Sequence, residues 1–349
     1  MKYPHLCLLV IACCLFPISA DAYTYKGMSY GMGHTQTSLA GAQSDQSLAK
    51  MKAAGVTMVA LNVVWFQTST TANTMAEDFD WGSSDYESVA HAIDTIHSLG
   101  MAVMLKPMIN ISDDDYTWRA EIDPTDKDAW FASYRKFVGL YADLAEKKKV
   151  AMFSIGCELC TLEKTSNDAR WAALIANIRS RYSGILTYSA NWAPLNQTTG
   201  GYENITWWNQ LDLIGIDEYC PIAESNNPTV AQMVAAWRKE ASDIESWRTS
   251  KRLTDKSVIF TEVGYQSADG TAQTPWGVDS GPVDMQEQAD CYTALFTVLP
   301  TKSWWEGLFL WDWDRKPDAG GPKDLGFSPQ NKLAETVLKS NFLPKPKAR

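Results

Sequence analysis

The sequence predicts a single-domain (β/α)8 TIM barrel of the α/β class, and two observations lead to this prediction. Short β-rich apolar segments alternate with longer amphipathic segments eight times between residues 23 and 342, without a Pro/Gly/Ser-rich linker. Such alternation indicates a parallel sheet with helical connections. Glycines such as Gly55 and Gly100 stand where a helix would end before a strand. An open doubly wound sheet is the alternative, because residues 191–210 are irregular.

Each predicted strand is a short apolar run, and each predicted helix has apolar residues at helical spacing. In chain order we expect strands at residues 26–30, 57–64, 102–108, 151–155, 185–189, 213–216, 257–261 and 307–311. We expect helices at residues 38–54, 86–99, 127–147, 168–181, 229–247, 286–298 and 332–340.

The two ends of the chain differ from this pattern. Residues 1–22 contain Lys2, a short apolar stretch and then Ala20-Asp21-Ala22, which is typical of a signal peptide. We therefore expect a secreted protein that begins near Tyr23 and has no membrane association after cleavage; a membrane anchor is the competing interpretation. Residues 343–349 are expected to form a disordered tail, and residues 23–342 the barrel domain.

Composition narrows the classes of partner. The 31 Lys and Arg residues against 41 Asp and Glu residues give a net charge of -10, which disfavours nucleic acid. The chain has 15 Trp and 14 Tyr residues, and aromatic faces in excess of a core's needs are often used to stack on sugar rings. We expect a monomer without a cofactor or a metal. A zinc site in particular lacks ligands, because only four histidines are present and the CxxC motif occurs once. One or two disulfides are plausible among Cys157, Cys160, Cys220 and Cys291.

Two glutamates are the strongest candidates for catalysis. Chemistry in such a barrel occurs at the C-terminal ends of the strands, and Glu158 and Glu262 each follow an apolar strand segment. They lie 104 residues apart (158 to 262), which corresponds to three βα units and assigns them to strands 4 and 7. These strand ends face each other across the mouth of a closed barrel. A facing pair of carboxylates is what the cleavage of a glycosidic bond requires.

Several motifs now permit a comparison with a known family. They are Ile155-Gly156-Cys157-Glu158-Leu159, Ile214-Gly215-Ile216-Asp217-Glu218-Tyr219, Phe260-Thr261-Glu262-Val263-Gly264-Tyr265, Trp311-Asp312, Lys106-Pro107 and Trp118-Arg119. With these motifs the chain resembles a glycoside hydrolase of clan A, and most of all family 113, the β-mannanase family. The resemblance extends over residues 26–342.

The resemblance implies roles for individual residues. Glu158 would be the general acid/base and Glu262 the nucleophile of a retaining hydrolase. Tyr219 would donate a hydrogen bond to Glu262, and Trp311 would form the floor of the subsite for the sugar under attack. Further candidate substrate-binding residues at strand ends are Asn62, Trp65, Lys106, Asn191, Trp192 and Asp217.

One position departs from the pattern of the clan. An Asn usually precedes the acid/base and contacts the sugar 2-hydroxyl, whereas Cys157 stands here. Asn191 or Asn62 could supply that contact.

The predicted function is that of a secreted endo-β-mannanase-like hydrolase, which cleaves β-1,4 linkages in mannan or glucomannan with retention. The alternatives are the same machinery acting on another β-glycan, such as a glucan, a xylan or a differently linked mannan, or a carbohydrate-binding barrel without catalysis. We predict that the carboxyl groups of Glu158 and Glu262 lie ~5 to 5.5 Å apart. We also predict that the Tyr219 hydroxyl lies within ~3.2 Å of Glu262.

Overall fold

A computed structural model describes residues 24–32, 35–113, 115, 117–193, 200–277 and 281–345. The predicted signal peptide and the last four residues of the predicted tail lie outside the described residues. No helix of the described part is long and apolar enough to cross a membrane.

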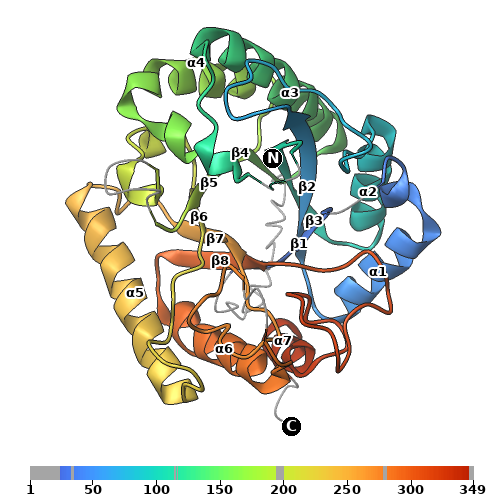
Figure 1. The fold of residues 1–349 in the computed structure, drawn as a ribbon, viewed down its shortest axis with the longest axis vertical. Helices are drawn as coiled ribbons and strands as arrows, with labels where there is room; N and C mark the ends of the chain where they lie inside the picture. Colours follow the sequence, from blue (N-terminus) through green and yellow to red (C-terminus); the bar gives the residue numbers. More distant parts are fainter. Residues whose placement is uncertain are drawn as a thin grey trace, which may run out of the picture.

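Eight parallel strands close into a barrel in the order of the sequence, as predicted (Figure 1). The barrel is closed because β1 pairs with both β2 and β8. The strands are β1 (Tyr25–Tyr30), β2 (Met58–Gln67), β3 (Ala102–Ile111), β4 (Met152–Cys157), β5 (Ile185–Asn191), β6 (Ile214–Asp217), β7 (Val258–Val263) and β8 (Trp305–Leu310).

Helices surround this barrel (Figure 1). They are α1 (Ala42–Ala53), α2 (Tyr86–Ser98), α3 (Lys127–Lys148), α4 (Asp168–Arg179), α5 (Val230–Ser250), α6 (Met285–Val298) and α7 (Leu333–Phe342). Among the described residues between β5 and β6 there are only short 3-10 turns, η5 (Tyr202–Asn204) and η6 (Trp208–Gln210), so the irregular fifth unit was correctly predicted.

Local sequence explains where the helices begin and end. The side chains of Asp85 and Asp126 accept backbone N–H groups of the first turns of α2 and α3, and Thr229 forms a capping box with Gln232 at the start of α5. Gly55 has a φ of 96° after α1, a left-handed conformation that glycine adopts without steric cost. These signals stand in the sequence, and they account for the agreement between predicted and observed boundaries.

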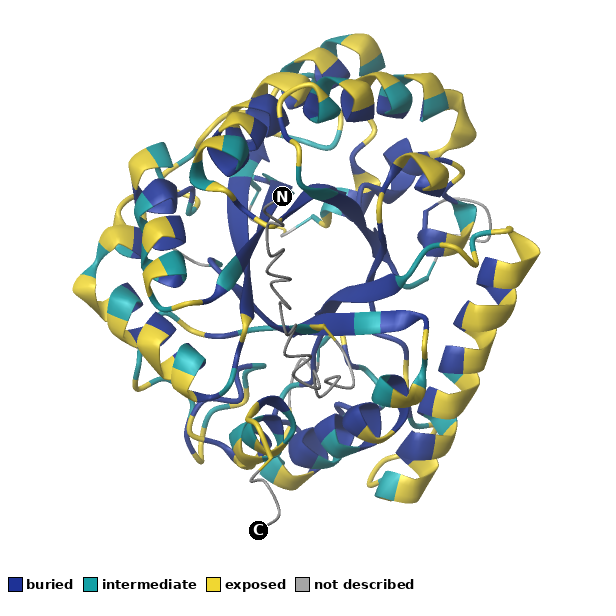
Figure 2. Cartoon of the chain, turned by 180° about the vertical axis from the view of Figure 1, so that it is seen from behind, coloured by how far each residue is buried: buried dark blue, intermediate teal, exposed yellow. Residues whose placement is uncertain are grey.

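Most residues of the strands are buried, as Figure 2 shows by the dark blue that covers nearly all of the barrel. One apolar cluster fills the barrel interior and consists of Met58, Ala60, Met104, Met152, Leu213, Ile259 and Phe309. A much larger cluster lies between the strands and the helices. Trp207 and Trp208 belong to that larger cluster and are buried, so they do not reach a ligand.

The expectation of disulfides is wrong for the structure, in which Cys157, Cys160, Cys220 and Cys291 are all free and buried. The four thiols have other neighbours. The Cys157 thiol donates to Asp217, and the Cys291 thiol contacts the sulfur of Met233. Burial raises the pKa of each of these thiols, which keeps them in the neutral form.

Candidate active site

A cavity of about 570 Å³ contains the ends of several strands and the two glutamates. Glu158 directly follows β4, and Glu262 is the fifth residue of β7. Both side chains line this one cavity, as the assignment to strands 4 and 7 predicted. The complete lining consists of Trp118, Glu158, Asn191, Trp192, Ala193, Tyr219, Glu262, Trp276, Trp311 and Phe327.

The backbone turns sharply to present Glu158. The pairing of β4 with β5 shifts register between Ser154 and Cys157, and Glu158 itself has a φ of 50°. A positive φ is uncommon outside glycine, and such residues concentrate at functional sites, where they cost about 1–3 kcal/mol. The local strain therefore serves to aim the carboxyl group into the cavity.

Three donors hold the Glu158 carboxyl group. The Arg119 guanidinium forms an ion pair of 2.8 Å with Oε2, and the Trp118 indole N–H donates to the same oxygen at 3.1 Å. The Asn191 side-chain amide donates to Oε1 at 2.9 Å. The side chain of Asn110 in turn accepts hydrogen bonds from Arg119, the shorter at 2.8 Å, which fixes the guanidinium. Both oxygens of Glu158 are thus held in one orientation.

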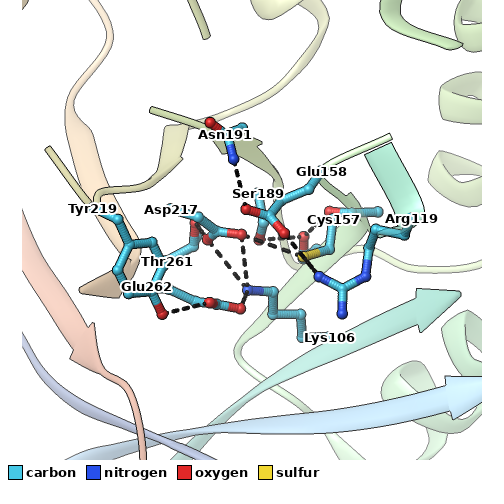
Figure 3. A network of polar contacts seen from close by, with 12 residues as sticks. Lys106, Arg119, Cys157, Glu158, Ser189, Asn191, Asp217, Tyr219, Thr261 and Glu262 are labelled. Carbon is cyan, nitrogen blue, oxygen red and sulfur yellow. Dashed lines mark hydrogen bonds and ion pairs between the residues drawn. The ribbon is translucent and has the colours of Figure 1, made fainter. Parts of the chain in front are cut away.

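Glu262 is held by a different set of donors, shown in Figure 3. The Lys106 ammonium lies 2.6 Å from Oε1, and the Tyr219 hydroxyl donates to Oε2 at 2.9 Å. The Tyr219 distance confirms the predicted contact. Burial raises the pKa of Tyr219, and nearby carboxylates raise it further, so the phenol keeps its proton and acts as the donor.

Asp217 is completely buried next to this pair. Its oxygens accept from Lys106 at 3.2 Å, from the Thr261 hydroxyl at 2.6 Å and from the Cys157 thiol at 3.3 Å. Burial and the charge of Glu262 raise the pKa of Asp217, and Lys106 opposes this shift. Burial alone would lower the pKa of Lys106, yet Asp217 and its other anionic neighbours raise it above the ordinary value. Lys106 is therefore a permanent cation between two carboxyl groups.

The charges of these five side chains do not cancel. Lys106 and Arg119 are two cations, whereas Glu158, Asp217 and Glu262 are three carboxyl groups, so the fully ionised set carries one net negative charge. One bound proton makes the set neutral, and a buried site strongly favours neutrality. Among the three carboxyl groups, burial and the charge of Glu262 raise the pKa of Asp217, so this buried carboxyl group is the one assigned the proton, next to the two glutamates that face the cavity.

Four of the predicted substrate-binding residues line the cavity: Asn191, Trp192, Tyr219 and Trp311. Trp311 follows β8 and its backbone N–H donates to the carbonyl of Val263, which places it beside Glu262. This approach requires Gly264, because a Cβ there would lie 2.5 Å from the Trp311 carbonyl oxygen.

The predicted position of Trp65 is wrong. Its ring stacks on Phe137 of α3, with ring centroids 4.6 Å apart, so it lies on the helix side of β2. The side chains of a strand alternate between its two faces, and Val64 and Phe66 are the neighbours that point to the mouth of the barrel.

Three further candidates lie outside the lining of the cavity. Lys106 and Asp217 are fully buried and bind Glu262 and each other, so the prediction that they contact substrate is corrected: they support a residue that faces the cavity. Asn62 is 1% exposed and pairs in register with Lys106. It is also absent from the cavity wall, so Asn191, not Asn62, is placed to contact a sugar hydroxyl.

Several functional residues were not among the predicted site residues. Trp118 and Arg119 precede Glu158 by 40 and 39 residues. Trp276 and Phe327 lie in loops after β7 and β8. The only signal for the first two was the Trp118-Arg119 motif. The sequence marked Trp276 only as a loop tryptophan, for which stacking on a polysaccharide and packing were equally plausible, and no pattern marked Phe327.

Among the residues that the structure describes, two groups of side chains have the composition of metal ligands: Cys157 with Glu158 and Asp217, and Asp269 with Asp284 and Glu287. In the first group, Lys106 and Arg119 already bind the carboxylates, and two cations there disfavour a third. In the second group, both Glu287 oxygens accept backbone N–H groups, and Asp284 caps α6. The donor set of each group is therefore used within the protein.

A cavity at the mouth of a (β/α)8 barrel with two glutamates on strands 4 and 7 defines a glycosidase-type active site. Comparison with known proteins agrees. The family model of Glycoside Hydrolase Family 113 matches residues 28–332, and the chain belongs to this family of glycoside hydrolases. No curated protein sequence matches the chain significantly.

Solved structures of the family are similar over nearly the whole chain. A GH113 β-1,4-mannanase complex is 29% identical with a TM-score of 0.79, covering 93% of this chain and 100% of the other. The GH113 β-mannanase AaManA from Alicyclobacillus acidocaldarius is 26% identical with a TM-score of 0.78, covering 92% and 97%. A β-glucuronidase of Faecalibacterium prausnitzii, at 15% identity and a TM-score of 0.58, covers 93% of this chain and 49% of its own and shares the fold alone.

Proposed function

We propose that this glycoside hydrolase cleaves β-1,4-mannosidic bonds within mannan or glucomannan and retains the anomeric configuration. The observation that carries the proposal is the single cavity lined by Glu158 and Glu262, each with its own set of donors. The similarity to mannanases of the same family supports mannan as the substrate.

In the first step Glu262 is the nucleophile and Glu158 the acid. An oxygen of Glu262 attacks the anomeric carbon while the bond from that carbon to the glycosidic oxygen breaks, and the proton of Glu158 passes to the departing oxygen. Lys106 and Tyr219 hold the carboxyl group of Glu262 and fix its orientation. The product of this step is a glycosyl ester on Glu262 and a released sugar.

In the second step the roles of Glu158 reverse. The carboxylate of Glu158 takes a proton from water, the water oxygen attacks the anomeric carbon, and the bond to Glu262 breaks. Two inversions at one carbon give net retention. Arg119 and Asn191 hold the carboxyl group of Glu158 in place between the two steps.

The substrate test uses a panel of pure polysaccharides with a reducing-sugar assay: mannan, glucomannan, β-glucan and xylan. We expect release on mannan and glucomannan, with products of several lengths, and a β-anomer as the first product in proton NMR spectra. Activity confined to glucan or xylan would overturn the proposed substrate, and an initial α-anomer would overturn retention.

We also propose that the protein is secreted, which the composition of residues 1–22 supports. Expression of the full chain in a secreting host should yield extracellular protein whose N-terminal sequence begins near Tyr23. Retention of residues 1–22 on a membrane-bound product would contradict this proposal.

A further inference from the structure

Tyrosine hydroxyl groups hold the backbone on both sides of Glu158. Glu158 has a φ of 50°, and strained backbone of this kind persists only where the surrounding structure fixes it. Before the turn, the carbonyl of Ile155 accepts a hydrogen bond from the Tyr134 hydroxyl at 2.9 Å. After the turn, the backbone N–H of Leu159 donates to the Tyr188 hydroxyl at 2.8 Å. The strained turn is therefore fixed at both of its ends.

Tyr188 is itself fixed by a buried carboxyl group that the proposed mechanism does not use. Its hydroxyl donates to Oε1 of Glu163 at 2.5 Å. Tyr188 is completely buried, and Glu163 is 2% exposed. A hydroxyl has one proton, so a Tyr188 that gives this proton to Glu163 presents its lone pairs to the N–H of Leu159. Glu163 thus sets the direction of the hydroxyl that holds the residue next to Glu158.

The backbone of Glu163 contributes to the same set of hydrogen bonds. Glu163 is the last residue of η3 (Cys160–Glu163), and its backbone N–H donates to the carbonyl of Leu159 at 3.1 Å. The ring of Tyr188 packs directly on β4, since a Cβ on Gly156 would lie 2.9 Å from its Cε2 atom. Both backbone polar groups of Leu159 are therefore held, one by Tyr188 and the other by the turn that carries Glu163.

We infer that Glu163 and Tyr188 are positioning residues for the acid/base, which hold the backbone of Leu159 and thereby the direction of the Glu158 carboxyl group. The inference rests on the proposed role of Glu158. Neither Glu163 nor Tyr188 belongs to the cavity lining, so they act on the substrate only through Glu158. A buried carboxyl group is costly compared with an apolar side chain. The positioning role gives a physical reason for a glutamate at this buried position.

The protonation state of Glu163 indicates which variant can replace it. Burial raises the pKa of Glu163 to about 7; the hydrogen bond from Tyr188 opposes this shift, and the charge of Glu158 adds to it. The neighbouring Tyr188 and Cys160 keep their protons, because burial raises the pKa of both side chains. At pH 5.5 Glu163 is therefore neutral. Glutamine, which is neutral and retains a carbonyl oxygen, is its matched substitute at this pH.

The test measures how much acid assistance each variant retains. One substrate is β-1,4-mannotetraose, whose cleavage needs a proton donor, and the other is 2,4-dinitrophenyl β-mannobioside, whose leaving group departs without one. The measured quantity is the ratio of kcat/KM for the tetraose to kcat/KM for the dinitrophenyl substrate at pH 5.5. We expect Tyr188→Phe and Glu163→Leu each to lower this ratio by about tenfold, because the direction of the Glu158 carboxyl group is no longer fixed.

Three variants complete the design. Glu163→Gln retains an acceptor for the Tyr188 hydroxyl and should recover most of the ratio lost in Glu163→Leu. A double variant that combines Glu163→Leu with Tyr188→Phe should have the ratio of Tyr188→Phe alone, because Glu163 acts through Tyr188. Tyr182→Phe is the matched control: the Tyr182 hydroxyl donates to the carbonyl of Val150 at 2.8 Å, at the opposite end of β4 from Glu158. Its ratio should equal that of the wild type.

Each outcome has a defined meaning. A ratio that falls in Tyr188→Phe and Glu163→Leu, recovers in Glu163→Gln and is unchanged in Tyr182→Phe supports the positioning role. Equal losses on both substrates indicate a merely structural role and overturn the inference. An unchanged ratio in Tyr188→Phe, or a Glu163→Gln ratio as low as that of Glu163→Leu, overturns it as well. Melting temperatures verify folding, and if Glu163→Leu does not fold, Tyr188→Phe decides.

The proposed function is tested separately in the same assay. Glu158→Ala should lower the ratio further than Tyr188→Phe; if it lowers both substrates equally, the proposed acid role fails and the inference fails with it. If the wild type cleaves another oligosaccharide and not mannotetraose, only the proposed substrate fails. The same ratio is then measured with that oligosaccharide and its dinitrophenyl glycoside.

Discussion

Removal of the positive charge of Lys106 is the most informative perturbation of the site. Lys106→Met preserves most of the side-chain volume but leaves Glu262 and Asp217 without the cation that now lies 2.6 Å and 3.2 Å from their oxygens. None of the three side chains is more than 6% exposed, so water cannot replace the ammonium. Breaking a buried pair by removing one partner costs about 3–5 kcal/mol, and we expect an unfolding free energy lower by that amount at pH 7.

The measurement is urea-induced unfolding of four proteins: the wild type, Lys106→Met, Asp217→Asn and the double variant. Asp217→Asn removes one of the two carboxylates that the missing cation would leave unpaired. The loss of unfolding free energy in the double variant should therefore be smaller than the sum of the two single losses, by a coupling energy of roughly 1–3 kcal/mol. A lower pH should also reduce the loss in Lys106→Met, because Asp217, whose pKa is raised by burial and by the charge of Glu262, is then protonated and needs no counter-ion.

An exposed ion pair supplies the control. Lys239 lies 2.6 Å from Asp243, as close as Lys106 to Glu262, but the two side chains are 78% and 50% exposed. Lys239→Met should change the unfolding free energy by less than ~1 kcal/mol. If Lys106→Met also stays within ~1 kcal/mol of the wild type, or if its loss and that of Asp217→Asn simply add, Lys106 is not the buried counter-ion described above.

Three further predictions concern individual side chains. Glu158→Ala should lower cleavage of the polymer by at least ~100-fold but spare formation of the glycosyl-enzyme from a dinitrophenyl glycoside. Glu262→Ala should abolish both reactions. Steady-state kinetics measure cleavage of the polymer, and burst kinetics measure formation of the glycosyl-enzyme. Tyr219→Phe removes the 2.9 Å donor to Glu262 and should lower kcat/KM by roughly 10- to 100-fold and the unfolding free energy by about 1–3 kcal/mol, because the buried Glu262 oxygen loses its donor. Burial raises the pKa of Glu163 from 4.5 to about 7. Between pH 4.5 and pH 7 the folded state therefore keeps a proton on Glu163 that the unfolded state has lost. The contribution of Glu163 to the unfolding free energy falls by about 3 kcal/mol as pH rises from 4.5 to 7. Glu163→Gln should flatten that part of the pH–stability curve in thermal unfolding.

Each of these predictions has a result that contradicts it. Added azide should rescue the dinitrophenyl substrate in Glu262→Ala and give the inverted glycosyl azide; an inverted azide from Glu158→Ala would exchange the two roles. Unchanged kinetics in Tyr219→Phe would show that Lys106 alone orients the nucleophile. A pH–stability curve of Glu163→Gln with the same slope as that of the wild type would place the titrating group elsewhere.

The barrel was predictable because each unit carries its own signals. Apolar strand segments, helix caps such as Asp126 and glycines such as Gly55 are local, and the structure retains all of them. The boundary of β2 is different: it continues to Gln67, beyond the predicted end at residue 64, because it pairs with β3 as far as Ile111. The partner strand fixes that boundary, and a sequence does not show which residues pair.

The candidate site was predictable where it depends on the position of a strand end. Glu158, Glu262, Asn191 and Tyr219 come together because the barrel brings the C-terminal ends of β4 to β7 to one face. Trp276 was not predictable in the same way, since its place in the cavity depends on the path of a long loop.

The errors at Trp65 and Lys106 have two different causes. Trp65 was misplaced by the two-residue period of the strand: Asn62 pairs in register with the inward-pointing Lys106, so residue 65, three positions later, must point to the helices. The alternation was available in the sequence, because Asn62 and Trp65 are three positions apart in one strand and point to opposite faces, but the register that shows which of them points inward was not. Lys106 was predicted at a strand end in contact with substrate, but it lies five residues before the end of β3, below the cavity wall. A charged residue at that depth cannot remain unpaired, and the Lys106 ammonium contacts the carboxyl groups of Asp217 on β6 and Glu262 on β7, across the barrel from β3. Its burial therefore implied a role in holding Glu262 and not in contacting sugar.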